Sequence, residues 1–130
     1  MPGSSAPAGR PSAVVKWAVA ARPWSFPASI MPVVFGTALA VVVGGGPFSP
    51  LLFLWALATM VVLHAAANML SDVFDFRRGL DRDVTPVSGA LVRGWLTDRR
   101  VIRAAAALFA LGTLSGLLIA RLAGWSLLVI

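Results

Sequence analysis

The residues of this chain that could carry out chemistry are concentrated in residues 68–83, which read NMLSDVFDFRRGLDRD. Within this segment, Asn68, Asp72 and Asp75 are spaced i, i+4 and i+7. If the preceding helix continues through them, the three side chains share one face and direct their oxygen atoms into a common space. The spacing therefore predicts an oxygen-rich site at the end of a helix.

The ligand types in this segment suit a hard divalent cation. Carboxylate and amide oxygens are typical of Mg²⁺ sites, where one or two carboxylates act together with substrate phosphates. Gly79 is a natural helix stop, after which Asp81 and Asp83 can fold back from a loop. Arginine binds phosphate oxygens in bidentate fashion, and the candidates are Arg77, Arg78, Arg82 and Arg93. Mg²⁺ and these arginines beside an apolar cavity would hold a diphosphate whose tail dissolves among the helices.

The same segment also allows a plainer interpretation. It could be a loop whose arginines only set the orientation of the neighbouring membrane helices, while its aspartates pair with them in water. Residues 71–103 hold five aspartates and no glutamate, which weighs mildly against this alternative, because a solvated face usually mixes the two acids. Short acidic motifs have low specificity, so the spacing alone leaves both interpretations open.

The composition indicates the surroundings of this segment. The 130 residues are 58% hydrophobic, against about 45–50% in soluble domains, so a lipid bilayer is the expected partner. The net charge of +6 does not predict nucleic-acid binding, because the cations lie between apolar runs, as in the short cytoplasmic loops of membrane proteins. The chain has no cysteine, which excludes disulfides and thiolate metal sites in these residues.

Apolar runs predict three complete membrane spans, at about residues 26–43, 51–70 and 102–120. Each run can cross a hydrocarbon core of about 30 Å at about 1.5 Å per residue. Thr97 is the expected N-cap ahead of the third run. Residues 121–124 are expected to form a turn, after which residues 125–130 open a fourth span. The predicted fold class is an all-α polytopic transmembrane helix bundle.

The first part of the chain has a different character. Residues 1–13 are rich in Pro, Gly, Ser and Ala, which predicts a disordered tail ahead of a membrane domain over residues 14–130. Residues 14–24 are typical of an interfacial stretch, in which Lys16 and Arg22 stay in water. The chain stops within an apolar run too short to cross a membrane, so we expect it to be a fragment.

The distribution of charge predicts the orientation. Cations precede the first span, and seven of the eleven Lys and Arg residues fall in residues 71–103, whereas the turn between the first two spans is uncharged. Lys and Arg collect on the cytoplasmic side. The N-terminus and the acidic segment are therefore predicted to be cytoplasmic, in a protein of the cell inner membrane.

Two blocks of the sequence carry a resemblance to a known family. Residues 21–37, ARPWSFPASIMPVVFGT, and residues 68–83, followed by TPVSG at residues 85–89, resemble the UbiA superfamily of intramembrane prenyltransferases. Within it, the chain looks most similar to the 1,4-dihydroxy-2-naphthoate polyprenyltransferase branch. The resemblance covers about residues 14–118, and two blocks at the right separation are far more specific than either alone.

The resemblance implies a fold and an activity. Family members are nine-helix bundles with two aspartate-rich cytoplasmic motifs that bind a prenyl diphosphate through Mg²⁺, and this chain contains the first motif. The implied reaction is transfer of a prenyl group from a polyprenyl diphosphate to an aromatic acceptor, in menaquinone or related lipid biosynthesis. We expect these residues alone to be inactive.

The resemblance also assigns residues. Asp72, Asp75 and Asp81 would be the acidic catalytic and metal-binding residues, with Asn68 as a further metal ligand. Many members carry Asn as a metal ligand where this chain has Ser71, so either Asn68 substitutes for it or the metal site differs. Gly79 matches the naphthoate branch.

Other readings of the chain are weaker. CDP-alcohol phosphotransferases also place aspartates between membrane helices, but they require Asp-Gly-x-x-Ala-Arg, which residues 72–75 do not begin. A transporter half would place ions near the bilayer midplane, whereas these aspartates lie at a helix end. His64 is expected to hydrogen-bond between helices, and the Gly112 and Gly116 pair to allow close helix packing.

Overall fold

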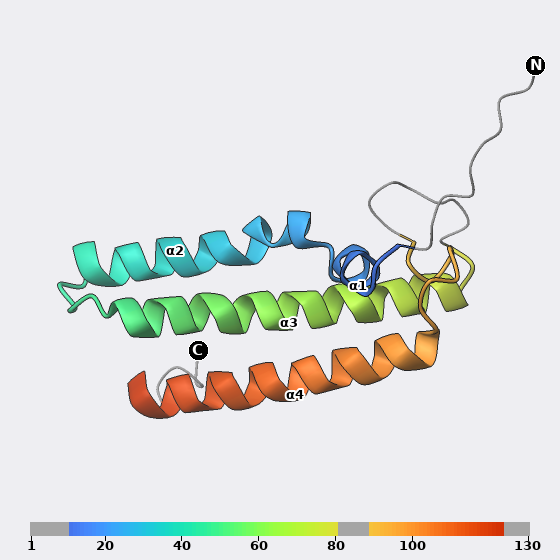
Figure 1. The fold of residues 1–130 in the computed structure, drawn as a ribbon. Coiled ribbons are helices and arrows are strands. Elements are labelled where there is room, and N and C mark those ends of the chain that lie inside the picture. Colours follow the sequence, from blue (N-terminus) through green and yellow to red (C-terminus); the bar gives the residue numbers. More distant parts are fainter. Residues whose placement is uncertain (1–10, 81–88, 124–130) are drawn as a thin grey trace, which may run out of the picture.

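The computed structural model describes residues 11–80 and 89–123, and every regular element within these ranges is a helix. In chain order the elements are α1 (Ala13–Ala21), the 3-10 turn η1 (Pro23–Ser25), α2 (Pro27–Val42), α3 (Pro50–Arg77) and α4 (Asp98–Ala123). Figure 1 shows α2, α3 and α4 side by side, with α1 against the half of α3 that ends at Arg77. The all-α prediction is confirmed for the described residues.

The first three helical elements form one bent arm, Ala13–Val42. The Ser12 side chain caps α1 by accepting from the Val15 backbone N–H at 3.4 Å, so the predicted tail gives way to helix at its last residue. Arg22 ends α1 in the left-handed conformation, with a φ of 53°. Pro23 and Pro27 then start new helical segments, where their missing N–H groups leave no bond unmade. The two halves of the arm meet at an angle of 48°.

The long helix α3 runs without a break as far as Arg77 and so includes residues 68–77 of the acidic segment. Ser49 caps its start by accepting from the Leu52 N–H at 3.4 Å. Its 28 residues continue past the predicted end of the span at residue 70. Gly79 stops it with a φ of 68°, and the Leu80 N–H bonds back to the Asp75 carbonyl at 3.0 Å in a Schellman arrangement. The predicted stop at Gly79 is confirmed.

The last described helix, α4, starts where the sequence predicted and ends later. The Thr97 carbonyl accepts from the N–H groups of Arg100 and Val101, as expected of the residue before the first helical turn. The predicted turn at residues 121–124 is wrong for Arg121 to Ala123, because arginine, leucine and alanine all favour helix and continue α4. The predicted fourth span, residues 125–130, lies outside the described residues.

The apolar helices fit a membrane environment. Two of them, α3 and α4, are long and apolar enough to cross a bilayer, and the bent arm becomes a third crossing if it counts as one span. The 16 residues of α2 extend about 24 Å at about 1.5 Å per residue, which is less than the bilayer core of about 30 Å. The structure therefore contains helices for two of the three predicted spans, or for all three if the bent arm is counted as one span.

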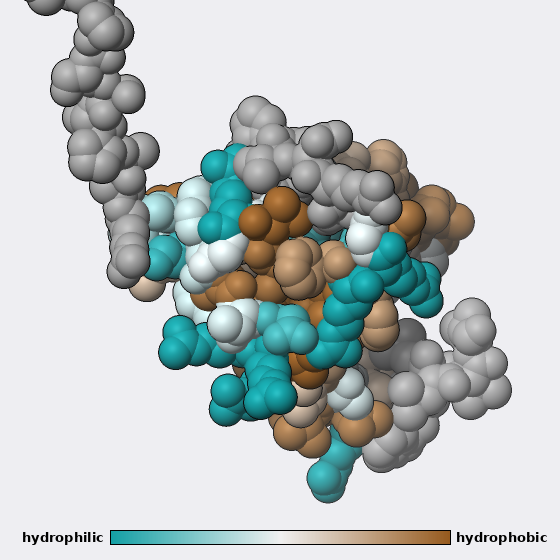
Figure 2. Space-filling view, turned by 90° about the vertical axis from the view of Figure 1, so that its right-hand side faces the viewer, coloured by the Kyte–Doolittle hydropathy of each residue, from teal (hydrophilic) through white to brown (hydrophobic). Residues whose placement is uncertain are grey.

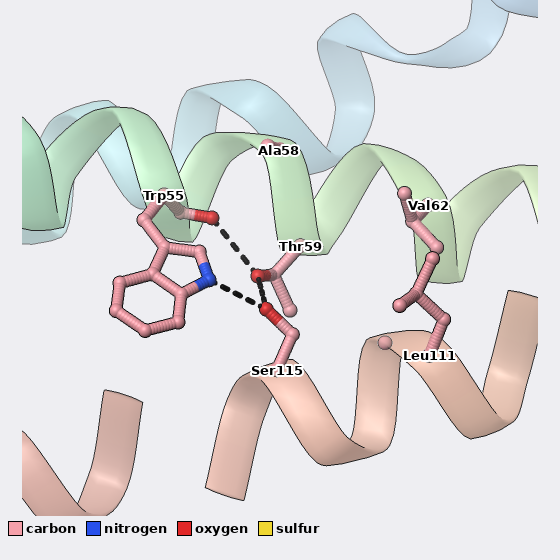
Figure 3. A pocket seen from close by; sticks show the side chains of 7 residues that line it. Trp55, Ala58, Thr59, Val62, Leu111 and Ser115 are labelled. Atoms are coloured by element: carbon pink, nitrogen blue, oxygen red, sulfur yellow. Dashed lines mark hydrogen bonds between the residues drawn. The ribbon is translucent and has the colours of Figure 1, made fainter. Parts of the chain in front are cut away.

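Two kinds of contact join α3 and α4. A Cβ atom added to Gly112 would lie 2.5 Å from Leu63 Cδ2, so this glycine permits the close approach, whereas a Cβ at Gly116 would meet no atom within 4 Å. Nearer the start of α3, the Trp55 indole N–H donates to Ser115 Oγ at 2.7 Å, and Thr59 Oγ1 lies 2.7 Å from the same oxygen (Figure 3). This polar cluster borders an apolar cavity of about 210 Å³.

The hydrophobic core cluster of the described residues lies at the end of the bundle where α3 stops. Buried apolar side chains from α1, α3, α4 and the segment before α4 meet there, including Ala20, Met69, Val73, Leu91 and Val101. Figure 2 looks at this end, where hydrophilic residues surround an apolar centre. Residues 68–80 of the acidic segment thus lie at the polar end of an apolar bundle.

Candidate active site

The structure contains the polar helix face that the spacing of Asn68, Asp72 and Asp75 predicted. Because the helix is continuous from Pro50 to Arg77, Asn68, Asp72 and Asp75 lie on successive turns of one side. Asn68 and Asp75 are half-buried, and Asp72 is buried with 3% of its side chain exposed. The three oxygen-bearing side chains are therefore presented together at the polar end of the bundle.

Asp72 forms an ion pair that crosses from α3 to the bent arm. Arg22 Nη2 donates to Asp72 Oδ1, and 25% of the Arg22 side chain is exposed. The prediction that Arg22 stays in water as an interfacial cation is therefore wrong. A buried carboxylate requires an opposite charge, and the left-handed turn at Arg22 directs this arginine inward. The sequence contained one usable signal, namely that Arg22 belongs to the first of the two blocks that carry the family resemblance.

Asn68 contacts the same part of the bent arm. Its Nδ2 donates to the Ala21 carbonyl at 2.8 Å and to Ser25 Oγ at 2.9 Å. One turn earlier on α3, His64 contacts the hydroxyls of both Ser25 and Ser29. The interpretation of His64 as a residue that bonds between helices is confirmed, whereas its two serine partners were not foreseen.

Asp75 lies nearer the surface than Asp72. The Ser71 hydroxyl, one turn before it, donates to Asp75 Oδ2 at 3.3 Å, and Ser71 is exposed. The two residues are therefore a local pair on the solvated end of α3. Asp81, assigned to the same site from the sequence, lies outside the described residues, as does Asp83.

The three candidate arginines that the structure describes have different surroundings at this end. Arg77 pairs with Asp98 at the start of α4, with Nη2 2.8 Å from Oδ2. Arg78 caps α3 and is exposed. Arg93 lies over the ring of Trp95, 4.7 Å from its centroid, and lines a polar cavity of about 520 Å³ together with Lys16. Arg82 lies outside the described residues, so a common diphosphate site of all four arginines stays a prediction.

The donor set fits a magnesium ion in its chemistry. Asn68, Asp72 and Asp75 offer amide and carboxylate oxygens, which hard cations prefer. Within residues 11–80 and 89–123, His, Cys, Asp and Glu side chains form no group of three that could hold a metal. A metal site here therefore needs the amide of Asn68, or groups outside those ranges.

Comparison with known proteins decides the family. Residues 29–130 match the model of the UbiA prenyltransferase family. The chain belongs to this family. The match includes α3 with its three oxygen-bearing residues and the whole of α4.

Relatives come from vertebrates and from a bacterium. The UbiA prenyltransferase domain-containing protein 1 of Xenopus tropicalis is 36% identical over 98 residues, which cover 75% of this chain and 28% of the relative. The human protein of the same name is 33% identical over 96 residues, covering 74% and 28%. The 1,4-dihydroxy-2-naphthoate octaprenyltransferase of Bacillus subtilis (strain 168) is 30% identical over 129 residues, covering 98% and 40%. The chain thus spans well under half the length of these relatives. No solved structure matches it significantly.

Proposed function

We propose that this UbiA family member transfers a prenyl group from a polyprenyl diphosphate to an aromatic acceptor, with Mg²⁺, within quinone or related lipid biosynthesis. Family membership and the similarity to a naphthoate octaprenyltransferase support the proposal. The observation that carries it is the continuous α3, which brings Asn68, Asp72 and Asp75 to one face at the polar end of an apolar bundle.

In this proposal the acidic face of α3 and the arginines have different roles in binding the diphosphate. Asp72, Asp75 and Asn68, with Asp81, would hold the divalent ion, which would supply positive charge to the leaving group when bound. Arg77, Arg78, Arg82 and Arg93 bind diphosphate oxygens, as planar guanidinium groups do. Together these residues fix the diphosphate in place and favour its departure.

The prenyl transfer step requires a site from which water is excluded. The allylic C–O bond breaks, its electron pair leaves with the diphosphate, and positive charge develops on the prenyl carbon. A carbon of the electron-rich ring then forms a bond to this prenyl carbon. The same ring carbon loses the substituent whose place the prenyl chain takes. The apolar walls of α3 and α4, with a cavity of about 380 Å³ between them that includes Met60 and Leu117, suit the prenyl tail and exclude competing water.

Orientation and location follow from charge. Lys16 lies beside Arg93 and Trp95, Arg78 caps the end of α3, and Arg100 lies in the first turn of α4. The turn between α2 and α3, at the opposite end of α3, carries no charged residue. The positive-inside rule supports a cytoplasmic polar end. We accordingly place the N-terminus and the acidic segment on the cytoplasmic side of the inner membrane.

The substitution Asp75→Asn in the full-length protein tests the proposal. We expect prenyl transfer to dihydroxynaphthoate to fall by about 100-fold or more, since loss of a group that positions the diphosphate affects the transition state directly. Arg100→Gln is the control, because Arg100 is an exposed charged residue in the first turn of α4 with no role in the proposed site, and it should keep the wild-type rate. If Asp75→Asn left the rate undiminished, the site assignment would be wrong.

A further inference from the structure

We infer that Ser25 is a positioning residue of the site. Together with the Ala21 carbonyl, it fixes the amide of Asn68 so that the side-chain oxygen is the group offered to a metal ion. The inference rests on the proposed function, because it concerns how Asn68 acts in that metal site. Ser25 belongs to η1 in the bent arm, outside the acidic segment.

The partners of Asn68 fix which way its amide points. One amide N–H donates to the Ala21 carbonyl at 2.8 Å and the other to Ser25 Oγ at 2.9 Å. A carbonyl oxygen only accepts, so the nitrogen must be the atom that faces α1. Turning the amide over would place two oxygens against each other and lose both bonds. Oδ1 therefore stays on the opposite branch, away from the arm.

Ser25 is itself held on three sides. Its single O–H donates to the Arg22 carbonyl at 2.7 Å. The contacts with Asn68 Nδ2 and with His64 Nε2, 2.9 Å away, must then both be bonds that the oxygen accepts. This places the His64 proton on Nε2, and Nδ1 accepts from the Ser29 hydroxyl. One donor and two acceptors use the full capacity of the Ser25 hydroxyl, so it cannot rotate without losing a bond.

The geometry also distinguishes Asn68 from Ser71, the two residues that could take the place of the Asn ligand of many family members. Ser71 is exposed, and its hydroxyl donates to Asp75 within the same helix. Asn68 is half-buried and is fixed by a second element. Groups that orient a metal ligand in this way typically change metal affinity by about 10–100-fold when removed. Ser25 therefore supports Asn68 as the ligand that compensates for serine at position 71.

Metal binding by the full-length protein in detergent tests the inference. The probe is Mn²⁺, titrated in the presence of inorganic diphosphate and followed by electron paramagnetic resonance. We expect Ser25→Ala to weaken Mn²⁺ binding by about 10–100-fold. Ser29→Ala is the matched control, since Ser29 also contacts His64 but does so through the other ring nitrogen, and it should bind like the wild type. Ser25→Cys, whose thiol is a weak acceptor, should show an intermediate loss and replaces Ser25→Ala if that variant does not fold.

A double-mutant cycle separates positioning from a general structural effect. If Ser25 acts through Asn68, Ser25→Ala has no further effect on Mn²⁺ affinity in an Asn68→Ala background. Additive losses, or a Ser25→Ala variant that binds like the wild type, would overturn the inference alone. A wild-type protein that binds no Mn²⁺ would overturn the proposed function and the inference with it.

Discussion

The ion pair between Arg22 and Asp72 predicts an unequal response to removal of its two partners. Arg22→Gln leaves a carboxylate with only 3% of its side chain exposed facing a neutral amide. Asp72→Asn instead leaves a guanidinium that is 25% exposed and can turn toward water or lipid headgroups. We therefore expect Arg22→Gln to destabilise the protein more than Asp72→Asn does.

The burial of the two side chains sets the size of the effect. Removing one partner of a buried ion pair costs about 3–5 kcal/mol. Because a quarter of Arg22 already meets solvent, we expect about 3 kcal/mol for Arg22→Gln, at the lower end of that range. Asp72→Asn keeps an acceptor for Arg22, so the loss should be about 1.5–2 kcal/mol, at the lower end of the range for hydrogen bonds to charged groups.

Equilibrium unfolding in mixed micelles of dodecyl maltoside and sodium dodecyl sulfate, followed by tryptophan fluorescence, measures these free energies. The double variant should be more stable than Arg22→Gln alone, since it carries no buried carboxylate that has lost the guanidinium of Arg22. Arg78→Gln, an exposed arginine at the same end, is the control and should lie within about 0.5 kcal/mol of the wild type. Equal losses for Arg22→Gln and Asp72→Asn would refute the reasoning, as would a loss below about 1 kcal/mol for Arg22→Gln.

Three further predictions concern packing, orientation and completeness. In the same unfolding assay, Gly112→Ala should be less stable than Gly116→Ala by about 1–3 kcal/mol, because only the added methyl at Gly112 meets Leu63. Equal stabilities of the two variants would contradict the packing of α3 against α4. These 130 residues contain no native cysteine, so a cysteine introduced here is the only one in this part of the protein, and any cysteine elsewhere in the full-length protein is first replaced. A membrane-impermeant maleimide should then reach Arg100→Cys from the cytoplasmic side and Phe48→Cys from the opposite side. Labelling of both variants from one side would reject the proposed orientation. The isolated 130-residue chain, incubated with Mg²⁺, a prenyl diphosphate and dihydroxynaphthoate, should yield no product, and turnover would show this expectation to be wrong.

Local patterns in the sequence predicted the parts of the site that depend on local structure. The spacing of Asn68, Asp72 and Asp75 has a meaning only on a helix, and α3 supplies that helix as far as Arg77. Gly79 stops it because only a residue without a side chain adopts the left-handed conformation easily. These features need no knowledge of distant residues, which is why the sequence was sufficient.

The contacts made by the bent arm could not be predicted in this way. Arg22 and Asp72 are 50 residues apart, and Ser25 and Asn68 are 43 apart. The charge pattern near Trp17 and Trp24 is typical of an interface, so the general rule placed Arg22 in water. The left-handed backbone at Arg22, uncommon for a residue with a side chain, reverses that outcome and is not visible in composition.

A stripe of polar side chains on α3 determines where the bent arm packs. His64, Asn68 and Asp72 are spaced i, i+4 and i+8, so they form one line along the helix. The arm meets this line in the reverse order, with Ser29 at His64, Ser25 between His64 and Asn68, and finally Arg22 at Asp72.

This matched order fixes the register of the two elements. In a membrane interior, a polar group without a partner costs several kcal/mol, because neither water nor lipid tails can replace the lost bond. Sliding the arm by one helical turn would separate the Arg22 and Asp72 charges and also break the contacts of Ser25. The hydrogen bonds of His64, which lies farthest from the acids, therefore help to hold Arg22 at Asp72, even though His64 contacts neither residue in the hydrogen bonds described here.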